Sequence, residues 1–377
     1  MKISVLKDSH PDETRVALIP VNVKKLVDLG LNISIEAGLG LGLNIADSDY
    51  EKMGAKVVAD RKSLMKTDMV VKIRRPELSD LDYYSEGCIS ISYLDPFNNP
   101  ELLQSLSSHK INSISMEMIP RTTKAQKMDV LSSQASLAGY FAVIKAAEQL
   151  NKIFPMMMTP AGTITPSKVF IIGAGVAGLQ AIATAKRLGA RVEAFDTRPV
   201  VEEQVQSLGG KFIKIDLGET GQTKDGYAKA LTEDQIQKQR EVMAKHCAGA
   251  DIVITTAQLF GRKAPVIITH EMLLRMTPGS IVVDLAVETG GNVEGSKVGE
   301  TVEVNGVKIL GIANMPGRVP LHASQMFSSN VTNFIDEFWD KENKKFDLNF
   351  DDEIIKGCVI THNGKLVNEM VKSVLNK

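Results

Sequence analysis

The clearest chemical pattern in the chain is formed by three glycines, Gly173, Gly175 and Gly178, which have the spacing G-x-G-x-x-G. An apolar, β-branched run precedes them and an alanine-rich stretch follows, so the pattern predicts a strand, a tight turn and a helix. Gly173 would permit the turn, Gly175 would let backbone approach a pyrophosphate, and Gly178 would let the helix pack on the strand. The first helical residues, Val176 and Ala177, would offer free N–H groups to the phosphates. This stretch therefore predicts a dinucleotide site.

A carboxylate follows at the position expected to bind ribose. Gly189 ends the predicted helix, 191–195 is predicted to be a strand, and Asp196 stands at its carboxyl end. An acid there accepts hydrogen bonds from both ribose hydroxyls. It repels a 2′-phosphate by roughly 4 kcal/mol per unit charge at ~4 Å and an effective dielectric of ~20, about a thousandfold in affinity. Thr197 and Arg198 complete this part of the predicted site; Arg198 could meet a phosphate, but the acid favours NAD(H) over NADP(H). An ordinary turn role for Asp196 stays open.

Two further strand ends are candidates for the same ligand. Thr256 and Ala257 close one predicted strand, and Asp284 closes another, which is followed by a loop of mostly small residues containing Glu288. The carboxyl ends of parallel strands form the ligand-binding edge of such sheets, and small residues there leave room for a flat ring. That these are merely short loops is an equally good interpretation.

A polar cluster, Arg121, Gln126, Asp129 and Ser132, precedes a predicted long helix at 133–150. If the segment is helical, Gln126, Asp129 and Ser132 fall within about a third of the circumference and could face one ligand. Such runs are usually solvated surface. Their place at the predicted junction of two domains, where cofactor clefts form, favours a functional role.

The composition restricts the class of protein. The chain has 377 residues, is 44% hydrophobic and 24% charged, and carries a net charge of −1, as expected of an ordinary globular protein with two domains. Without a basic tract, nucleic acid is not an expected partner. The three scattered cysteines and six histidines lack metal-ligand spacing, so no metal site is predicted, and a reducing compartment fits best. No stretch approaches the ~18 apolar residues of a membrane-spanning helix.

The alternation of short strands and helices predicts an α/β fold with two Rossmann-like parallel-sheet domains, joined by long helices at 133–150 and 321–339, with a cleft between them. We expect the first domain to comprise 1–133 and 322–377, and the nucleotide-binding domain to comprise 134–321. The glycine-rich segment 218–229 suits a flap, and Asn305-Gly306 predicts a hairpin turn.

Several motifs together resemble the NAD(H)-binding alpha subunit (domain I) of proton-translocating nicotinamide nucleotide transhydrogenase, which is related to alanine dehydrogenase. They are MIPRTTKAQKMDVLSSQ at 118–134, GAGVAGLQAIATAKRLG at 173–189, DGYAK at 225–229 and VDLAVETGGN at 283–292. The similarity extends over nearly the whole chain, and the first motif is specific to that family. The family's usual PGKPAP is replaced by FGRKAP at 260–265, which leaves the loop after Thr256 unassigned.

The resemblance implies a Re/Si-specific transhydrogenase that is active only with its partner subunits. It implies a homodimeric peripheral subunit on the cytoplasmic side of a membrane, which passes hydride directly between NADH and NADP+ on a partner subunit, coupled to proton movement through a membrane-spanning subunit. It also implies that Arg121, Asp129 and Ser132 orient the nicotinamide end of NAD, that Gln126 reaches towards the partner's nucleotide, and that Tyr227, beside Gly226, lies on a flap over NAD. One fingerprint in the chain agrees with the need for a second chain.

Two other functions remain as alternatives. Arg15 and Lys72 resemble the substrate-carboxylate ligands of alanine dehydrogenase, but Asp95 stands where that enzyme's proton-transfer histidine is expected, and Glu288 replaces its aspartate. An ionised carboxylate is poorly matched to accepting a proton near neutral pH as hydride leaves. The second alternative is a non-catalytic NAD-binding regulator.

Overall fold

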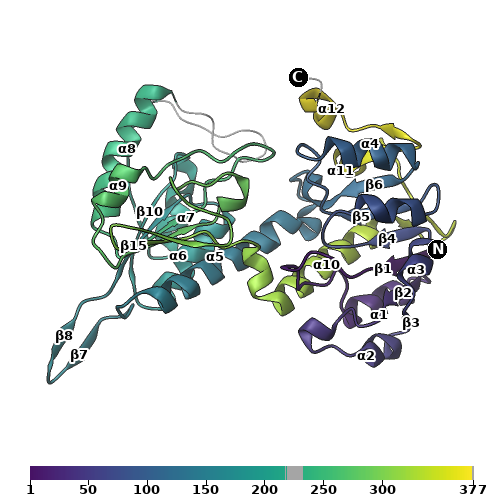
Figure 1. Ribbon diagram of the computed structural model, residues 1–377, viewed down its shortest axis with the longest axis horizontal. Coiled ribbons are helices and arrows are strands. Elements are labelled where there is room, and N and C mark those ends of the chain that lie inside the picture. Colours follow the sequence, from purple (N-terminus) through teal and green to yellow (C-terminus); the bar gives the residue numbers. More distant parts are fainter. Residues whose placement is uncertain (217, 219–231, 376–377) are drawn as a thin grey trace. The chain divides into compact units, whose positions relative to one another are not determined.

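The computed structural model describes residues 1–216, 218 and 232–375, and these fall into two compact units. The first comprises Met1–Gln134 and Val319–Lys377, and the second comprises Ala135–Arg318. The predicted domains divided at 133/134 and 321/322, whereas the compact units divide at 134/135 and 318/319. Both contain mostly parallel sheets with helices, which confirms the predicted fold class of two Rossmann-like α/β domains (Figure 1).

The first unit contains a sheet with the strand order β3-β2-β1-β4-β5-β6 followed by β18 and β19. The parallel strands are β1 (Lys2–Val5), β2 (Asn32–Glu36), β3 (Lys56–Val58), β4 (Met69–Val71), β5 (Ile89–Ser92) and β6 (Asn112–Ser115). The helices between them are α1 (Pro20–Asp28), α2 (Asp47–Lys52), α3 (Arg61–Met65) and α4 (Pro100–Ser108). The order 3-2-1-4-5-6 is that of dinucleotide-binding folds, with a switch in direction between β1 and β4.

The C-terminal part of the chain completes this first unit. Its elements are α10 (Pro320–Phe338), β16 (Trp339–Asp340), β17 (Lys345–Phe346), α11 (Glu353–Cys358), β18 (Val359–His362), β19 (Lys365–Leu366) and α12 (Glu369–Leu375). Strand β18 is antiparallel to β6, and the hydroxyl groups of Ser113 and Thr361 lie 2.7 Å apart in the buried interior. Helix α10 begins at a proline in the first turn, where the missing N–H has no helical partner to lose.

The second unit contains a sheet with the order β11-β10-β9-β12-β13-β15-β14. Its strands are β9 (Lys168–Ile172), β10 (Arg191–Phe195), β11 (Lys211–Phe212), β12 (Ile252–Thr255), β13 (Ile281–Asp284), β14 (Thr301–Val304) and β15 (Val307–Leu310). Its helices are α6 (Val176–Arg187), α7 (Glu202–Ser207), α8 (Glu233–Ala248) and α9 (His270–Leu274). Strands β14 and β15 turn at Asn305 and Gly306, whose φ angles of 49° and 76° fit the predicted type I′ hairpin.

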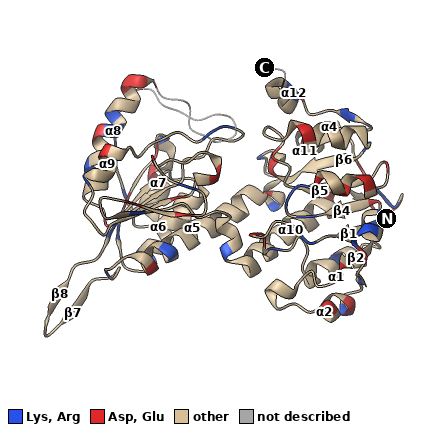
Figure 2. Ribbon diagram, viewed as in Figure 1, with Lys and Arg blue, Asp and Glu red and all other residues tan. Residues whose placement is uncertain are grey.

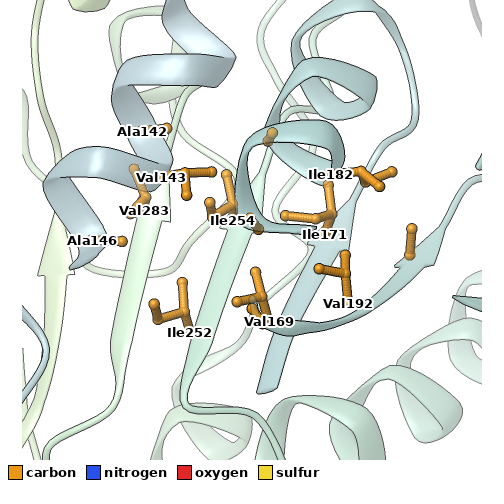
Figure 3. Close-up of a cluster of buried hydrophobic side chains, with 14 of the residues drawn as sticks. Ala142, Val143, Ala146, Val169, Ile171, Ile182, Val192, Ile252, Ile254 and Val283 are labelled. Carbon is orange, nitrogen blue, oxygen red and sulfur yellow. The ribbon is translucent and has the colours of Figure 1, made fainter. Parts of the chain in front are cut away.

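Helix α5 (Val130–Gln149) begins in the first unit and ends in the second, where it covers one face of the sheet. Figure 3 shows its small side chains, including Ala142 and Ala146, beside apolar residues of β9, β12 and β13. Small residues allow close approach: a Cβ atom on Gly139 would lie 2.1 Å from the carbonyl oxygen of Ala177. This packing holds α5 directly against the first turn of α6, where the glycine fingerprint lies.

The sequence did not predict the hairpin formed by β7 (Met157–Thr159) and β8 (Gly162–Ile164). Every residue of its two strands is exposed, and the hairpin extends away from the second unit's sheet (Figure 1). Figure 2 shows that it carries no charged side chain, and Met158 and Ile164 are 74% and 49% exposed. Its short, uncharged strands place apolar side chains in solvent.

Candidate nucleotide site

The candidate site in the second unit lies at the carboxyl ends of β9 and β12, neighbouring strands between which the strand order reverses. Ligands of open α/β sheets bind at such a switch point. The chain after β9 turns at Gly173, and the chain after β12 continues through Thr256. The Oγ1 atom of Thr256 donates a hydrogen bond to the carbonyl oxygen of Gly173 at 2.9 Å. The predicted residues Gly173 and Thr256 are therefore brought together, with Thr256 fixing the turn.

The three glycines have distinct surroundings, and these fit a pyrophosphate. Gly173 has a φ of +96°, and a Cβ there would lie 2.5 Å from Oγ1 of Thr256. A Cβ on Gly178 would lie 1.9 Å from the carbonyl oxygen of Gly173, so the helix could not pack as it does with any larger residue. At Gly175 the nearest atom to a Cβ would be Nη2 of Arg198, 3.9 Å away. The space over Gly175 is thus open where a phosphate would approach.

Helix α6 begins at Val176 with Gly175 as its extended N-cap, and Gly175 offers no side-chain cap to the first N–H groups. The N–H groups of the first turn, which includes Val176 and Ala177, have no partner within the helix and carry the positive end of its dipole. Val176 is 38% exposed at this end. The arrangement can bind an anion, as the sequence predicted.

Asp196 lies directly after β10, and its carboxylate is fully engaged by the chain. Oδ2 accepts the backbone N–H of Ala174 at 2.8 Å and Nη2 of Arg198 at 2.8 Å. Oδ1 accepts the backbone N–H of Arg198 at 2.8 Å and its Nε at 2.9 Å. These hydrogen bonds raise the pKa of Arg198 above its ordinary value. Thr197, between the two charged residues, is partly exposed.

Asp284 is buried and its carboxylate folds the loop that follows β13. Oδ1 accepts the N–H of Ala286 at 3.0 Å, and Oδ2 accepts the N–H groups of Asn292 at 3.0 Å and Val293 at 3.2 Å. With an exposed fraction of 0%, the carboxylate shapes the loop and does not present itself at the surface of the site. Asp284 is therefore a positioning residue in this structure, in place of the direct contact that the sequence predicted.

Asn292, which we did not predict as a site residue, joins the loops after β12 and β13. Its Nδ2 donates to the carbonyl oxygens of Ala257 at 2.9 Å and Pro265 at 2.8 Å, and its Oδ1 accepts the N–H of Ala257 at 3.1 Å. The side chain is buried. The loop around FGRKAP, which departs from the family pattern, is thereby fixed to the strand edge at Pro265.

Three other predicted cofactor residues contribute less to the described site. Glu288 is exposed, and its Oε2 accepts the backbone N–H of Asn314 at 2.9 Å. Gly226 and Tyr227 lie outside the described residues. Their predicted flap position stays a prediction.

The polar motif of the first unit is not one helix, which corrects the geometry that we expected for Gln126, Asp129 and Ser132. Residues Gln126–Met128 form a single 3₁₀ turn, and Asp129 has extended backbone angles of φ −73° and ψ 92°. Asp129 instead caps α5: its Oδ1 accepts the N–H of Ser132 at 2.8 Å, and its Oδ2 accepts the hydroxyl of Ser132 at 2.6 Å. Arg121 and Gln126 are exposed.

Side chains of α10 and of the segment before α11 hold this motif in place. Asn330 and Asn333 each donate Nδ2 to the carbonyl oxygen of Lys127 at 3.0 Å. The ammonium group of Lys127 lies 2.7 Å from Glu337, and Lys124 lies 2.9 Å from Asp352. The segment that carries Arg121 and Gln126 is therefore fastened to the unit on both sides of its 3₁₀ turn.

The first unit also contains the residues that resemble alanine dehydrogenase ligands. Arg15 is buried, and its Nε and Nη2 donate to the two carboxylate oxygens of Glu13 at 2.7 Å each, while Nη1 donates to Oε1 of Gln134 at 2.8 Å. Burial alone would raise the pKa of Glu13, but the hydrogen bonds and charges of Arg15 and Arg74 outweigh it and lower that pKa. The guanidinium of Arg15 is thus held by groups of the chain itself.

Lys72, at the end of β4, is 1% exposed, and its Nζ has no hydrogen-bond partner among the described residues. Asp8 lies 3.9 Å away and accepts the backbone N–H groups of Ile73 and Arg74. Burial lowers the pKa of Lys72 and raises that of Asp8 to about 6. These two groups form a buried ion pair at the strand edge of the first unit.

Asp95 occupies the place of the expected dehydrogenase histidine and serves a turn. It has a φ of 48°, donates its N–H to Oε1 of Glu117 at 2.6 Å, and accepts hydrogen bonds from the side chains of Asn98 and Asn99. Among residues 1–216, 218 and 232–375, no group of three or more His, Cys, Asp or Glu could hold a metal ion. No helix within these ranges is long and apolar enough to cross a membrane.

Comparison with known proteins identifies similar chains. The family model described as alanine dehydrogenase/PNT, C-terminal domain, matches residues 142–369, and that of the N-terminal domain matches residues 4–138. An NAD(P) transhydrogenase alpha subunit of Rhodospirillum rubrum is 44% identical over 376 residues, which cover 98% of this chain and 98% of that protein.

The structure of a transhydrogenase from Sinorhizobium meliloti is 43% identical and has a TM-score of 0.85, covering 98% of this chain and 100% of that one. Alanine dehydrogenase of Bacillus subtilis (strain 168) is 31% identical over 340 residues, which cover 88% of this chain and 84% of that enzyme. The chain is thus similar to both kinds of protein, with the higher identity to the transhydrogenases.

Proposed function

The chain belongs to the alanine dehydrogenase/PNT family, and from this membership we propose that it is the NAD(H)-binding subunit of a proton-translocating NAD(P) transhydrogenase. In this role it binds NAD(H), and hydride passes directly between that nucleotide and NADP(H) held by a partner subunit. A membrane-spanning subunit couples the transfer to proton translocation. The observation that carries the proposal is the motif at 118–134, whose loop the first unit holds in place beside the cap of α5.

The binding of NAD(H) is supported by the open space over Gly175 and by the acid after β10. The first N–H groups of α6 bind the pyrophosphate, and Asp196 accepts hydrogen bonds from the adenosine ribose. When bound, NAD(H) supplies or accepts the hydride at its nicotinamide ring. Arg121, Asp129 and Ser132 orient that end of the cofactor, and Gln126 reaches towards the partner's nucleotide. We place these contacts in the cleft that the sequence predicts.

The need for a second chain follows from the nucleotide count. The 377 residues contain one G-x-G-x-x-G fingerprint, whereas transfer between two dinucleotides requires two sites. The NADP(H) site therefore belongs to a partner subunit, and the proton path to a membrane subunit on whose cytoplasmic side this chain binds as a peripheral component. The chain acts as a homodimer. The exposed, uncharged hairpin β7–β8 supports self-association, because apolar side chains in solvent favour burial against another surface.

Alanine dehydrogenase is the second candidate, favoured only by Arg15 and Lys72. Against it stands Asp95, whose carboxylate accepts hydrogen bonds within a turn where oxidation of an amine needs a group that takes a proton. A third candidate, a non-catalytic NAD-binding regulator, would bind NADH but would support no transfer with any partner.

Reconstitution distinguishes these three functions. The purified chain is mixed with an NADP(H)-binding transhydrogenase subunit and NADH, and reduction of an NADP+ analogue is followed by absorbance. The proposal predicts transfer only when both proteins are present, and no NADH formation from alanine and NAD+ by the chain alone. Tight NADH binding without transfer to folded partners would favour the regulator, and robust alanine oxidation would favour the dehydrogenase.

A further inference from the structure

The most unusual feature of the nucleotide site is the ion pair between Asp196 and Arg198. Asp196 accepts four hydrogen bonds, of which three come from Arg198, at distances of 2.8 to 2.9 Å. The side chains of Arg198 and Asp196 are 16% and 7% exposed. Partial burial reduces the screening of such a pair by solvent, and a charged donor on a charged acceptor gives a strong hydrogen bond. Arg198 is therefore fastened to the acid that selects the nucleotide.

This pairing changes how Asp196 can discriminate between nucleotides. The repulsion of a 2′-phosphate by a bare carboxylate is largely offset when a guanidinium of opposite charge lies 2.8 Å from it. Nη2 of Arg198 is also the nearest atom to the open space over Gly175, 3.9 Å from the Cβ position there. The planar guanidinium has the geometry that binds phosphate oxygens with two parallel hydrogen bonds. A phosphate-binding group is thus present at the edge of the site but is occupied by Asp196.

We propose that Arg198 is a specificity-determining residue, a latent receptor for the 2′-phosphate of NADP(H) that Asp196 holds in an ion pair. The inference rests on the proposed function in one respect, the binding of NAD(H) at this site. Ribose hydroxyls can share the oxygens of Asp196 while part of the ion pair remains. A 2′-phosphate, in contrast, has to take the guanidinium from Asp196 and leave that carboxylate facing a second anion. Selection of NAD(H) therefore depends on the competition of carboxylate and phosphate for Arg198.

The experiment measures NADH and NADPH affinity of the purified chain by fluorescence titration, so no partner subunit is required. Asp196→Asn removes the charge and keeps an oxygen to accept the N–H of Ala174. We expect NADH to bind about tenfold more weakly and NADPH at least about tenfold more tightly than to the unchanged chain. Adding Arg198→Ala to Asp196→Asn is expected to abolish the gain for NADPH. Asp196→Ser gives a second variant in which the same crossover is expected.

The matched control is Arg191→Ala in the Asp196→Asn background, because Arg191 is an exposed guanidinium at the opposite end of β10. This change is expected to leave NADPH affinity unaltered, and the gain from Asp196→Asn is expected to fall as salt concentration rises. Equal NADPH affinity of Asp196→Asn with and without Arg198, in proteins of unchanged melting temperature, would overturn the proposal. Failure of the unchanged chain to bind NADH would instead contradict the proposed function and, with it, this inference.

Discussion

Asn330, on α10, donates its side-chain amide to the carbonyl oxygen of Lys127, 203 residues away in the sequence, at 3.0 Å. Its Oδ1 accepts the hydroxyl of Ser133 in the first turn of α5 at 2.7 Å. One buried amide thus joins α10 to both sides of Asp129, between the 3₁₀ turn that carries Gln126 and the helix that Asp129 caps. The candidate hydride-transfer loop is therefore held by a residue that belongs to neither the motif nor the fingerprint.

Replacing Asn330 by Ala should lower the free energy of unfolding by about 1–3 kcal/mol, because buried polar groups of the loop and α5 lose a partner. With the partner subunit present, the maximal transfer rate should fall at least about tenfold while NADH affinity changes by less than about twofold. Asn333→Ala is the matched control, since its bond to Lys127 is exposed, and its effects should be small. Equal losses of transfer rate from both variants would contradict the assigned role of Asn330.

Gly175→Ala separates cofactor binding from folding. A Cβ at Gly175 meets nothing closer than 3.9 Å, so the melting temperature should hardly change, while a methyl group in the phosphate position should weaken NADH binding at least about tenfold. Gly249→Ala, whose Cβ would also meet only atoms 3.8 Å away or more, should leave NADH affinity unchanged. Isothermal titration calorimetry checks both variants. NADH affinity retained in Gly175→Ala would place the pyrophosphate elsewhere.

Gln126→Ala tests the part of the motif that we assign to the partner's nucleotide. The side chain is exposed, so its removal should leave both the fold and NADH affinity nearly unchanged. Single-turnover transfer to an NADP+ analogue on the partner subunit should slow by about tenfold or more, as expected of an interaction made late in the reaction. Thr123→Ala, in the same exposed segment, is the control. Parallel losses of NADH affinity and transfer would refute the separate role of Gln126.

Asp8 predicts a pH dependence of stability. Burial raises the pKa of Asp8 from 3.8 to about 6, although Lys72 opposes the shift, so the folded chain binds this proton more tightly than the unfolded chain. The stabilisation is complete below pH 3.8 and is lost as pH rises to about 6. The loss is on the order of 3 kcal/mol. Urea unfolding across this range should show the step in the unchanged chain.

Asp8→Asn should lack that step, whereas Asp12→Asn, an exposed carboxylate in the same loop, should retain it. The relevant quantity is the difference in unfolding free energy between the unchanged chain and each variant at each pH. A difference between the unchanged chain and Asp8→Asn that stays constant across the window would show that Asp8 titrates alike in the folded and unfolded states.

The sequence predicted the parts of the fold that local patterns determine. Apolar β-branched runs indicated β9, β12 and β13, and glycine spacing indicated the turn at Gly173, because one backbone geometry serves those residues. Hairpin β7–β8 was missed because its short strands contain no buried face and therefore no periodic signal.

The site required tertiary information that no local pattern contains. Asp284 has the residue type of a ligand-binding acid, yet backbone N–H groups from its own loop engage it inside the unit. The helical spacing assumed for Gln126 and Ser132 failed because Asp129 ends one turn and caps the next helix. Asn330 reaches Lys127 from the far end of the chain, a pairing that depends entirely on the packing of α10.

The central claim is direct transfer of hydride from NADH on this chain to NADP+ on a partner subunit. It is tested most directly with NADH that carries deuterium at the transferred position of nicotinamide C4. The labelled nucleotide is mixed with the chain, the NADP(H)-binding subunit and an NADP+ analogue, and the product is analysed by mass spectrometry. The account predicts that the reduced analogue contains the deuterium and that none is exchanged with water. An unlabelled reduced product, or no product from two folded, nucleotide-bound proteins, would contradict it.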